Sequence, residues 1–528
     1  MIKTSINTKN NLGDGVLLLS KELFFVLFVL AIVLIFHPAR TDAATFDVAA
    51  GSSTVNDGDS ICQLEEAGTN INDGARTYAD CEETGTYGSN DTIQLPAGTI
   101  NLSGSGLELR NSAKIIGNGK GISIIDGGDY QGGIRFYGSG SGIGSGLTLP
   151  DFVIRNFTLS NLGSGIALGG GGIGQLTVEG LEIKNAAAGI FLGGFEEISV
   201  TDSYLHDINY VGSGIPPTGI IALSSFDQQF SGKTVNVNIE NTTISDTSVG
   251  VILYAVGSEG SGSGSDAEIY TGTVDATIQN TTFANLHSTG NEPDPISAAA
   301  GISTFVGGAT ITYNTINNTY SNISSPAASN YKGVAVSEGI LSGSGLALDS
   351  RSHISHTAQN DLYATGGEGH SVNYARWAMA GSGEFEQNPN SNLFTTTSKG
   401  GNLSSDGSLS KWLNQSTDQH NVTSLASFLG VLSDNGGPVP TLALKQGSPA
   451  VDAGTPVSGM KTDARGALRP QGNGFDVGAY ESAFSRETLA GTGEDSRQFI
   501  VNALVLTLLS SGSIWLARRL AKSKYQLH

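Results

Sequence analysis

The chain has 528 residues and a net charge of −21, with 48 Asp and Glu against 27 Lys and Arg. This acidic balance excludes nucleic acid as a partner, because phosphate binding needs a basic surface. It also disfavours anionic polysaccharides such as pectate, unless cations bridge the two surfaces. The chain is 38% hydrophobic and holds 73 glycines, which is too apolar for disorder and suits a β fold with many tight turns.

Residues 1–44 are expected to be a signal peptide. Three lysines accompany the start of this segment, an apolar core follows at 23–36, and small residues at 41–43 offer a cleavage site. An uncleaved N-terminal anchor is the alternative, although the apolar core is short for a membrane span. Cleavage would leave the rest of the chain outside the cell.

Cys62 and Cys81 are the two cysteines of the chain. Both follow the expected leader, and an even pair in an oxidising compartment predicts a disulfide. Its closed loop is short, so loop entropy gives it a stabilisation of about 3 kcal/mol. The disulfide would hold an N-terminal cap at 45–111.

Six segments between 151 and 318 align without a gap. In each of them, apolar residues with polar neighbours show the alternation of a strand with one buried face, and a run of glycine plus apolar residues follows. A repeat of this kind predicts a solenoid. The segments are 151–161, 175–185, 197–207, 236–246, 275–285 and 308–318.

Each repeat is interpreted as three short strands, because its Gly, Asn, Thr and Ser residues disfavour helix. The smallest spacing is 22 residues, from Val178 to Val200, which is one coil of a parallel β-helix. The predicted fold class is therefore an all-β, right-handed parallel β-helix, with coils over 112–385. The predicted core columns are Ile154, Val178, Val200, Ile239, Ile278, Ile311, and Leu159, Ile183, Leu205, Ile244, Phe283, Ile316.

An Asn or Asp ends every repeat. These residues tolerate left-handed backbone, bond their own turn, and can bond one another from coil to coil. They are interpreted as an architectural ladder rather than as catalytic residues. The predicted ladder is Asn161, Asn185, Asp207, Asp246, Asn285 and Asn318.

Long insertions leave the same corner of different coils and should cluster in space. Insertions on one face of a repeat protein often form its binding face. The alternative is a tolerated ornament, since surface loops lengthen at little cost. The candidate contact residues are Tyr210, His287, Asp294, Tyr320 and Tyr331.

A catalytic cluster is weakly indicated. A hydrolase needs paired carboxylates, and a lyase needs a base beside acids that hold calcium, but neighbouring coils do not align such acids. The best candidate is Lys184 with His206, near Asp202, although such a trio is more often a set of polar surface residues without a catalytic role. His353 and His356 should point to opposite faces of a strand, and are interpreted as two unrelated surface histidines.

Residues 386–485 are assigned to a C-terminal cap. Its arginines and aspartates are interpreted as ion pairs under glycine-rich turns. The alternative is a calcium site made by Asp452, Asp463 and Asp476, because calcium prefers hard oxygen ligands. No other cofactor is expected.

Residues 486–528 carry three signals in order. The motif Leu489-Ala490-Gly491-Thr492-Gly493 precedes an uncharged stretch at 499–517, and a basic tail follows. The stretch predicts a membrane span with its basic end in the cytoplasm. The arrangement resembles a Gram-positive cell-wall sorting signal of the LAxTG type, which implies a sortase that cuts between Thr492 and Gly493. A plain single-span anchor is the alternative, and both predict a location at the cell surface.

Two further segments resemble families of exported bacterial proteins. The cysteine-containing segment before Asp-Thr-Ile-Gln-Leu-Pro-Ala-Gly (91–98) resembles CSLREAI-type surface proteins. Residues 432–481, with Asn-Gly-Gly-Pro, Gly-Ser-Pro-Ala-Val-Asp-Ala-Gly, Asp-Ala-Arg-Gly and Asp-Val-Gly-Ala-Tyr-Glu in order, resemble the choice-of-anchor Q domain. This resemblance implies a pectin-lyase-like β-helix on an exported protein whose anchor varies.

The expected function is adhesin-like binding of a glycan or of a neighbouring surface. A polysaccharide lyase or glycoside hydrolase on the same scaffold is the first alternative, and a structural spacer or coat is the second. The long insertions disfavour a spacer, and the missing acid pairs disfavour an enzyme. The fold alone does not decide among them.

Overall fold

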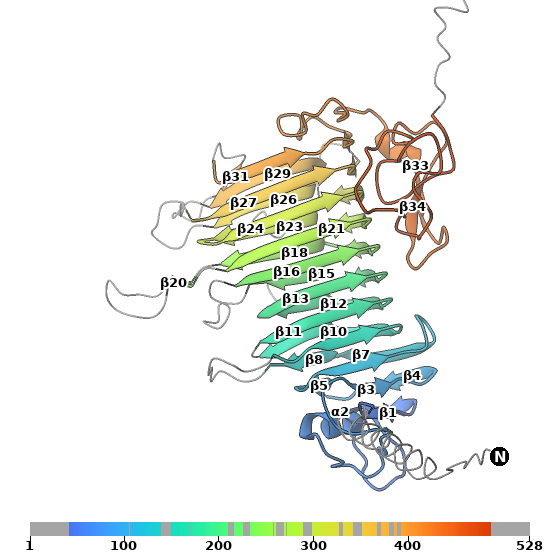
Figure 1. Ribbon diagram of the computed structural model, residues 1–528. Coiled ribbons are helices and arrows are strands. Elements are labelled where there is room, and N and C mark those ends of the chain that lie inside the picture. Colours follow the sequence, from blue (N-terminus) through green and yellow to red (C-terminus); the bar gives the residue numbers. More distant parts are fainter. Residues whose placement is uncertain are drawn as a thin grey trace, which may run out of the picture.

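The computed structural model is a parallel β-helix whose coils stack along one axis (Figure 1). The predicted fold class is confirmed. The structure describes residues 42–104, 106–138, 149–170, 172–209, 216–224, 233–256, 258–259, 269–270, 272–288, 298–326, 331–341, 351–366, 371–379, 385–387 and 392–486.

The first face of the β-helix is a sheet of eleven parallel strands. Their order in the sheet follows their order in the chain, so each coil adds one strand to the stack. They are β1 (Thr45–Asp47), β3 (Asp91–Gln94), β6 (Ala113–Ile116), β9 (Phe152–Arg155), β11 (Ile173–Glu179), β13 (Phe195–Thr201), β16 (Thr234–Glu240), β21 (Thr273–Gln279), β24 (Thr310–Ile316), β27 (His353–Gln359) and β31 (Phe394–Ser398).

The second face follows a short turn and is again a parallel stack. Two of its strands, β10 and β12, continue around a bend into the third face. The strands are β2 (Gly51–Ser52), β4 (Gly98–Asn101), β7 (Ser123–Gln131), β10 (Thr158–Gly170), β12 (Glu182–Gly193), β14 (Tyr204–Ile208), β17 (Thr243–Thr247), β22 (Thr282–His287), β25 (Thr319–Ser324), β28 (Leu362–Ala364) and β32 (Leu403–Ser404).

The third face completes each coil. Besides the ends of β10 and β12 it contains β5 (Leu107–Leu109), β8 (Ile134–Tyr137), β15 (Thr218–Leu223), β18 (Val249–Val256), β23 (Ala300–Gly307), β26 (Gly333–Leu341), β29 (Ser371–Met379) and the antiparallel β30 (Phe385–Gln387). Two short strands, β19 (Ser258–Glu259) and β20 (Ile269–Tyr270), pair outside the stack.

The core columns form as predicted through the first five repeats. Ile154, Val178 and Val200 pair in register from coil to coil, and none of these side chains is exposed. Ile239 and Ile278 continue the same column. Parallel strands lie about 4.8 Å apart, so each apolar side chain stacks on its counterpart and leaves little water in the interior.

The sixth repeat lies four residues further along the chain than predicted. Ile278 pairs with Thr315 and Phe283 pairs with Tyr320, so Ile311 and Ile316 do not occupy the expected columns. A shift of four preserves the alternation of buried and outward positions, which is why the hydrophobic pattern did not reveal it. The rings of Phe283, Tyr320 and Tyr363 stack inside the core, with neighbouring centroids 5.1 Å apart.

The predicted ladder is present with one correction. Asn161, Asn185, Asp207, Asp246 and Asn285 all have left-handed backbone, with φ between 51° and 56°. The sixth member is Asn322 (φ 53°) instead of Asn318, and its Nδ2 donates to Asn285 Oδ1 at 2.8 Å. Asn318 is fully buried, where its Oδ1 accepts from the Thr281 backbone N–H at 2.9 Å.

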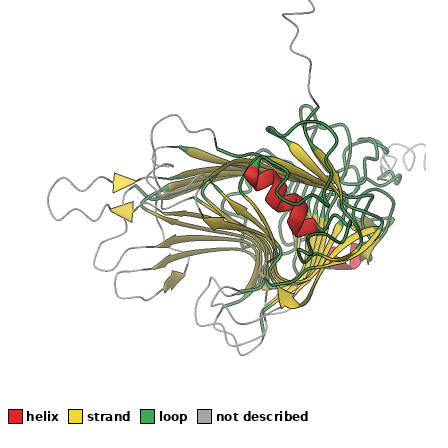
Figure 2. Cartoon of the chain, turned by 90° about the horizontal axis from the view of Figure 1, so that it is seen from below, coloured by secondary structure: helices red, strands yellow, loops and turns green. Residues whose placement is uncertain are grey.

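The N-terminal end is closed by α2 (Leu64–Asp73), an amphipathic helix that lies across the first coils (Figure 2). Leu64, Ala67 and Ile71 on its inner side are buried. The predicted disulfide between Cys62 and Cys81 is confirmed and holds the start of this helix. The coils begin earlier than 112, because β1 to β5 already belong to the stack.

Ala44 lies at the start of the described chain, inside the expected leader. It is fully buried, and its backbone N–H donates to Asp91 Oδ1 at 3.0 Å. The folded structure therefore includes Asp42, Ala43 and Ala44, which the sequence analysis placed before the cap.

The C-terminal region differs most from expectation. A last coil, β31 and β32, lies inside the segment assigned to the cap, and Leu409 and Leu413 then close the end of the core. Residues 429–486, here named the C-terminal module, lie alongside the coils (Figure 1). They contain β33 (Leu429–Ser433) and β34 (Thr441–Leu444), and follow the 3₁₀ turn η2 (Leu425–Phe428).

The C-terminal module covers the outer side of the second face. Leu442, Leu444 and Val477 pack with Leu362 of β28 and Leu403 of β32 in one buried apolar cluster. Hydrogen bonds tie the module to the turns between the first two faces: Asn360 Nδ2 donates to Thr455 O at 2.7 Å, and Thr243 Oγ1 donates to Pro440 O at 2.6 Å. The module thus runs back along the rod instead of extending it.

No helix among the described residues is long and apolar enough to cross a membrane. The rest of the leader, the motif at Leu489 to Gly493 and the span at 499–517 lie outside the described residues.

The stacked Tyr320 gives a test of the register. We expect Tyr320→Ala to lower the free energy of unfolding by about 3–5 kcal/mol, because it opens a cavity between two rings. Tyr320→Phe keeps the stack and should cost less than about 1.5 kcal/mol. Urea unfolding followed by circular dichroism would measure both, and an unchanged midpoint for Tyr320→Ala would place this residue on the surface.

Candidate functional site

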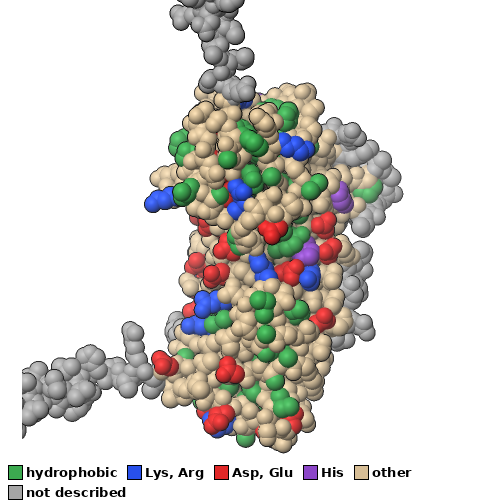
Figure 3. All heavy atoms as spheres, turned by 90° about the vertical axis from the view of Figure 1, so that its right-hand side faces the viewer, with side chains coloured by type: hydrophobic (Ala, Val, Ile, Leu, Met, Phe, Trp, Pro, Cys, Tyr) green, Lys and Arg blue, Asp and Glu red, His purple; other side chains and the backbone are tan. Residues whose placement is uncertain are grey.

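A cluster of charged side chains lies on the outer side of the second face. Glu182 and Lys184 stand two residues apart on β12, and Tyr204 and His206 occupy the matching positions on β14. The strand alternation puts all four on the same side, and the register places Lys184 beside His206 and Glu182 beside Tyr204. On the side of the molecule that carries the C-terminal module, basic, acidic and histidine side chains lie next to one another (Figure 3).

Glu182 is the centre of this cluster. Its Oε2 accepts from Thr158 Oγ1 at 2.8 Å and from Lys184 Nζ at 3.2 Å, while Oε1 lies 3.2 Å from His206 Nε2. The other imidazole nitrogen, Nδ1, lies 2.6 Å from Asp207 Oδ2. The His206 ring also stacks on Tyr204, with centroids 4.0 Å apart.

The contacts set the protonation states. The hydrogen bond from His206, together with those from Thr158 and Lys184, lowers the pKa of Glu182 to about 2 against the opposing effect of burial. Burial lowers the pKa of His206, but its hydrogen bonds to Glu182 and Asp207 outweigh burial and raise the pKa above its usual value. The carboxylates of Glu182 and Asp207 lie on either side of the imidazole and favour its protonated form.

This arrangement opposes general-base catalysis by His206 and general-acid catalysis by Glu182. A general base needs a free lone pair, and a general acid needs a pKa near the working pH. Both nitrogens of His206 are engaged, and Glu182 is ionised far below neutrality. The cluster therefore ties two coils together and presents Lys184, the side chain of which is 35% exposed.

The structure brings two of the three predicted catalytic residues together. Lys184 and His206 are neighbours, but Asp202 lies in a left-handed turn at φ 52°, where its backbone carbonyl accepts from Lys120 Nζ at 3.1 Å. Burial raises the pKa of Asp202. Glu182, the partner of both basic groups, was missed, although its spacing of two residues from Lys184 already indicated a shared face.

The interior of the β-helix holds a second charged group. Glu338 on β26 accepts from Tyr313 OH at 2.7 Å and from Arg376 Nε at 3.2 Å, and its side chain is not exposed. His356 stacks on Tyr313 and is fully buried, so it is not the surface histidine that was expected, although it does oppose the outward His353. Burial lowers the pKa of His356 to about 3, which keeps the imidazole neutral.

The three aspartates considered for calcium serve the C-terminal module as acceptors. Asp463 binds Arg465 Nη2 at 2.7 Å and the Glu481 backbone N–H at 2.9 Å. Asp476 accepts from the Asp452 backbone N–H at 2.8 Å and from Ser482 Oγ at 2.6 Å. Within the described part of the chain, no group of three acidic, histidine or cysteine side chains is arranged for a metal ion.

The arginines of this module form the expected pairs. Arg469 is buried, and its Nη1 donates to Glu481 Oε2 at 2.8 Å while Nη2 donates to Gly478 O at 2.6 Å. Arg465 lies 3.6 Å above the ring of Tyr480. These contacts support the interpretation of the segment as structural.

The structure places the predicted binding residues in different environments. Tyr320 is in the core, so its proposed contact role is wrong. The shifted register places it in β25 instead of an insertion, with its ring between those of Phe283 and Tyr363. His287 is exposed at the end of β22, with Nδ1 3.0 Å from Ser324 Oγ. Tyr331 meets Trp377 edge to face, with centroids 4.9 Å apart. Tyr210 and Asp294 lie outside the described residues.

The outer side of the third face is apolar. Its outward positions fall into two columns that run from β12 to β29, and Ile221, Ile252, Phe305, Ala375 and Trp377 among them form one cluster. We name these outward positions the apolar outer face. Its residues are Phe191, Ile221, Ile252, Ser303, Ser337 and Ala375 in one column, and Leu223, Tyr254, Phe305, Gly339 and Trp377 in the other. Phe191, Leu223 and Tyr254 are partly exposed, and the other residues of the two columns are buried.

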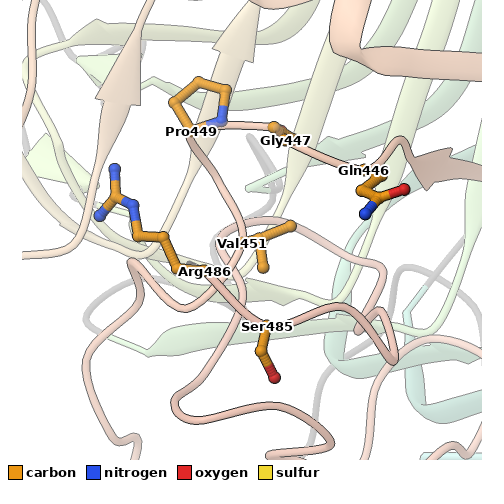
Figure 4. Close-up of a pocket in the computed structure, with 7 residues that line it drawn as sticks. Gln446, Gly447, Pro449, Val451, Ser485 and Arg486 are labelled. Carbon is orange, nitrogen blue, oxygen red and sulfur yellow. The ribbon is translucent and has the colours of Figure 1, made fainter. Parts of the chain in front are cut away.

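A pocket of about 600 Å³ lies in the C-terminal module between Gln446 and Arg486 (Figure 4). Gly447, Pro449 and Val451 line it, and Arg486 is the one charged side chain among the residues that do. The pocket therefore lacks the acid–base pair that hydrolysis or elimination would need.

Comparisons with known proteins give little information about this chain. No family model matches the sequence, and no curated protein matches it. The A-module of mannuronan C-5 epimerase AlgE4 from Azotobacter vinelandii, a solved structure, is similar over 55% of this chain and 87% of that module, at 15% identity and a TM-score of 0.24. So slight a likeness does not bear on function, and the resemblance to choice-of-anchor Q and CSLREAI-type proteins stays an expectation.

The charged cluster predicts a bell-shaped dependence of stability on pH. His206 stabilises the fold fully below its unfolded pKa of 6.5, and this contribution is lost as pH rises through the raised folded value. Glu182 contributes fully above 4.5 and loses its contribution as pH falls toward 2. Their joint contribution is therefore largest between pH 4.5 and 6.5.

We expect Glu182→Gln to lower the pKa of His206 and to lower stability most in that window. NMR titration of the imidazole protons would measure the pKa, with His206→Asn to assign the signal. Glu197→Gln on the first face, which removes a carboxylate bonded to Gln175, is the matched control. An unchanged His206 pKa in Glu182→Gln would contradict the pairing.

Proposed function

We propose that this chain is a surface-anchored β-helix protein that binds a glycan and does not cleave it. The carrying observation is the partly exposed end of the apolar outer face, where Phe191, Leu223 and Tyr254 present aromatic rings, an apolar side chain and a hydroxyl without a charge. Aromatic side chains give large contact area to the apolar faces of sugars, and hydroxyls hydrogen-bond to sugar hydroxyls.

The charged cluster on the second face supports binding over catalysis. Its acid is held ionised by three donors and its histidine is held by two carboxylates, so proton transfer to a substrate would first have to break these contacts. A glycosidase instead needs two carboxyl groups about 5–10 Å apart across one bond. A polysaccharide lyase or glycoside hydrolase is the second candidate function, and its one support is that such enzymes can be built on a β-helix.

Anchoring belongs to the proposal as well. The leader, the Leu489-to-Gly493 motif and the apolar stretch at 499–517 are sequence features that favour export and attachment to a cell wall or membrane, with a sortase as partner. A rod with one end attached would hold its outer faces away from the cell. That position suits adhesion to a polysaccharide or to a neighbouring cell surface.

The test is a panel of immobilised neutral and acidic polysaccharides incubated with the full chain, with and without calcium. We expect saturable retention on at least one polysaccharide without release of reducing or unsaturated sugar ends. Release of such ends would make the protein an enzyme. Absence of retention on every member, by a chain with an intact circular dichroism spectrum, would leave a protein partner or a structural coat.

A further inference from the structure

Asp361 is an acidic residue in a buried column of asparagines. Asn318, Asp361 and Asn402 occupy the same place on three successive coils, just before the strands β25, β28 and β32. None of these side chains is exposed. Asp361 Oδ1 accepts from the Asn318 backbone N–H at 2.8 Å, and the Asp361 backbone N–H donates to Asn402 Oδ1 at 3.0 Å. The carboxyl group of Asp361 therefore stands where the neighbouring coils have an amide group.

The two amide groups of this column also act as donors. Asn318 Nδ2 donates to Ile278 O at 2.8 Å, and Asn402 Nδ2 donates to Ala358 O at 3.3 Å. On the coil between them the matching backbone carbonyl belongs to Thr315, which is the register partner of both Ile278 and Ala358. A carboxylate has no proton to donate, whereas a protonated carboxyl group has one. The column therefore favours the protonated form of the carboxyl group.

The surroundings of Asp361 supply no cation to a carboxylate. In the part of the chain that the structure describes, the titratable groups of the surrounding core and of the module are neutral, acidic or paired with another side chain. They are Tyr320 on β25, His356 on β27, Tyr363 on β28, Asp418 after β32, and the pairs Glu338–Arg376 and Arg469–Glu481. Burial raises the pKa of Asp361 to about 7, against the hydrogen bonds that Thr315 and other neighbours donate to it.

The residues on either side of Asp361 hold the C-terminal module. Asn360 Nδ2 donates to Thr455 O at 2.7 Å, Asn360 Oδ1 accepts from the Thr455 backbone N–H at 2.8 Å, and the Asn360 carbonyl accepts from the Gly478 backbone N–H at 2.9 Å. Leu362 belongs to the apolar cluster between the module and the second face. Gly478 lies so close that an added Cβ would stand 3.2 Å from Leu362 Cβ. A movement of Asp361 would therefore shift both attachment points.

We propose that Asp361 is a pH-sensitive latch for the C-terminal module. In its protonated form it copies the asparagines on the two neighbouring coils and holds the turn at 360–362 in place. Loss of the proton leaves a buried carboxylate that has nothing to donate to the Thr315 carbonyl, so the turn opens toward water and the module docks less firmly. The latch lies between the coils and the segment expected to anchor the chain, and it does not depend on the proposed glycan binding.

The direction of the effect follows from the raised pKa. A carboxyl group whose folded pKa lies above its unfolded value of 3.8 stabilises the docked state fully below pH 3.8, and this contribution is lost as pH rises through about 7. The module should therefore be held most firmly in acid and most loosely above neutrality. Between pH 5 and pH 8 the equilibrium constant for its opening should rise by more than about tenfold.

Hydrogen exchange of the full chain, measured by mass spectrometry from pH 5 to pH 8, would test the latch. Peptides from 429–486 report on the docking of the module, and peptides from β11 and β13 on the first face report on the coils. The native chain is compared with Asp361→Asn at each pH, which removes the intrinsic pH dependence of exchange. We expect the ratio of native to variant exchange in the module to rise more than about tenfold from pH 5 to pH 8, while the ratio in β11 and β13 stays constant.

Asp246→Asn is the matched control. It makes the same chemical change at a turn with left-handed backbone, but Asp246 is partly exposed and does not belong to the buried column. The module of this variant should exchange like that of the native chain at every pH.

A module ratio that stays constant from pH 5 to pH 8 would overturn the latch. An equal rise in β11 and β13 would also overturn it, because Asp361 would then control the stability of the whole fold and not the docking of the module. Asn318→Asp keeps the proposal testable if Asp361→Asn folds poorly. This variant adds a second carboxyl group to the column, so its module should exchange like the native one at pH 5 and lose protection more steeply toward pH 8. A pH dependence equal to that of the native chain would contradict the proposal.

Discussion

Stacked left-handed turns are the constraint on which the rest of this structure depends. Between the first and second faces, one residue in each of seven coils has a positive φ of 48° to 63°. In six of these coils a second such residue bends the chain further along the second face. A β-helix closes only if every coil turns at the same place, because its core columns must overlap. The first row is Asn156, Gly180, Asp202, Asn241, Asn280, Asn317 and Asn360, and the second is Asn161, Asn185, Asp207, Asp246, Asn285 and Asn322.

The turns also carry a buried polar chain through the later coils. Asn318 Oδ1 accepts from the Thr281 backbone N–H, Asp361 Oδ1 from that of Asn318, and Asn402 Oδ1 from that of Asp361, all between 2.8 and 3.0 Å. Burial raises the pKa of Asp361 to about 7. Such a chain satisfies backbone groups that the turn leaves without a ladder partner, as buried polar groups require. The positions of the coils are thereby coupled to one another.

With the coils fixed, the three outer faces have different roles. The first is lined by Thr, Ser and Asn and faces solvent, whereas the C-terminal module covers much of the second. The uncovered part of the second face holds the Glu182–His206 cluster, in which charges satisfy one another. The outward residues of the third face are apolar, and from β15 to β29 most of them are buried.

Much of this architecture could be predicted from local sequence. Alternation around Ile154, Val178 and Val200 specified inward-facing strands, Asn and Asp marked the turns, and two cysteines after a leader indicated the disulfide, because each of these signals acts over a few residues. The register of the sixth repeat could not be predicted from such local signals. Ile311 and Thr315 share the same parity, so the hydrophobic pattern accepts both alignments, and only the stacking of Tyr320 between Phe283 and Tyr363 selects one.

The candidate sites depended on contacts that the sequence does not contain. Glu182 joins Lys184 and His206 only when two coils lie side by side. The C-terminal module likewise returns along the coils because it buries apolar residues of β28 and β32. No local sequence pattern predicts this packing. The sequence by itself determined a stacked β-helix, since period and turn chemistry are local. Only the tertiary structure decided which side chains meet on its surface, since that depends on register, the length of each insertion and the docking of distant segments.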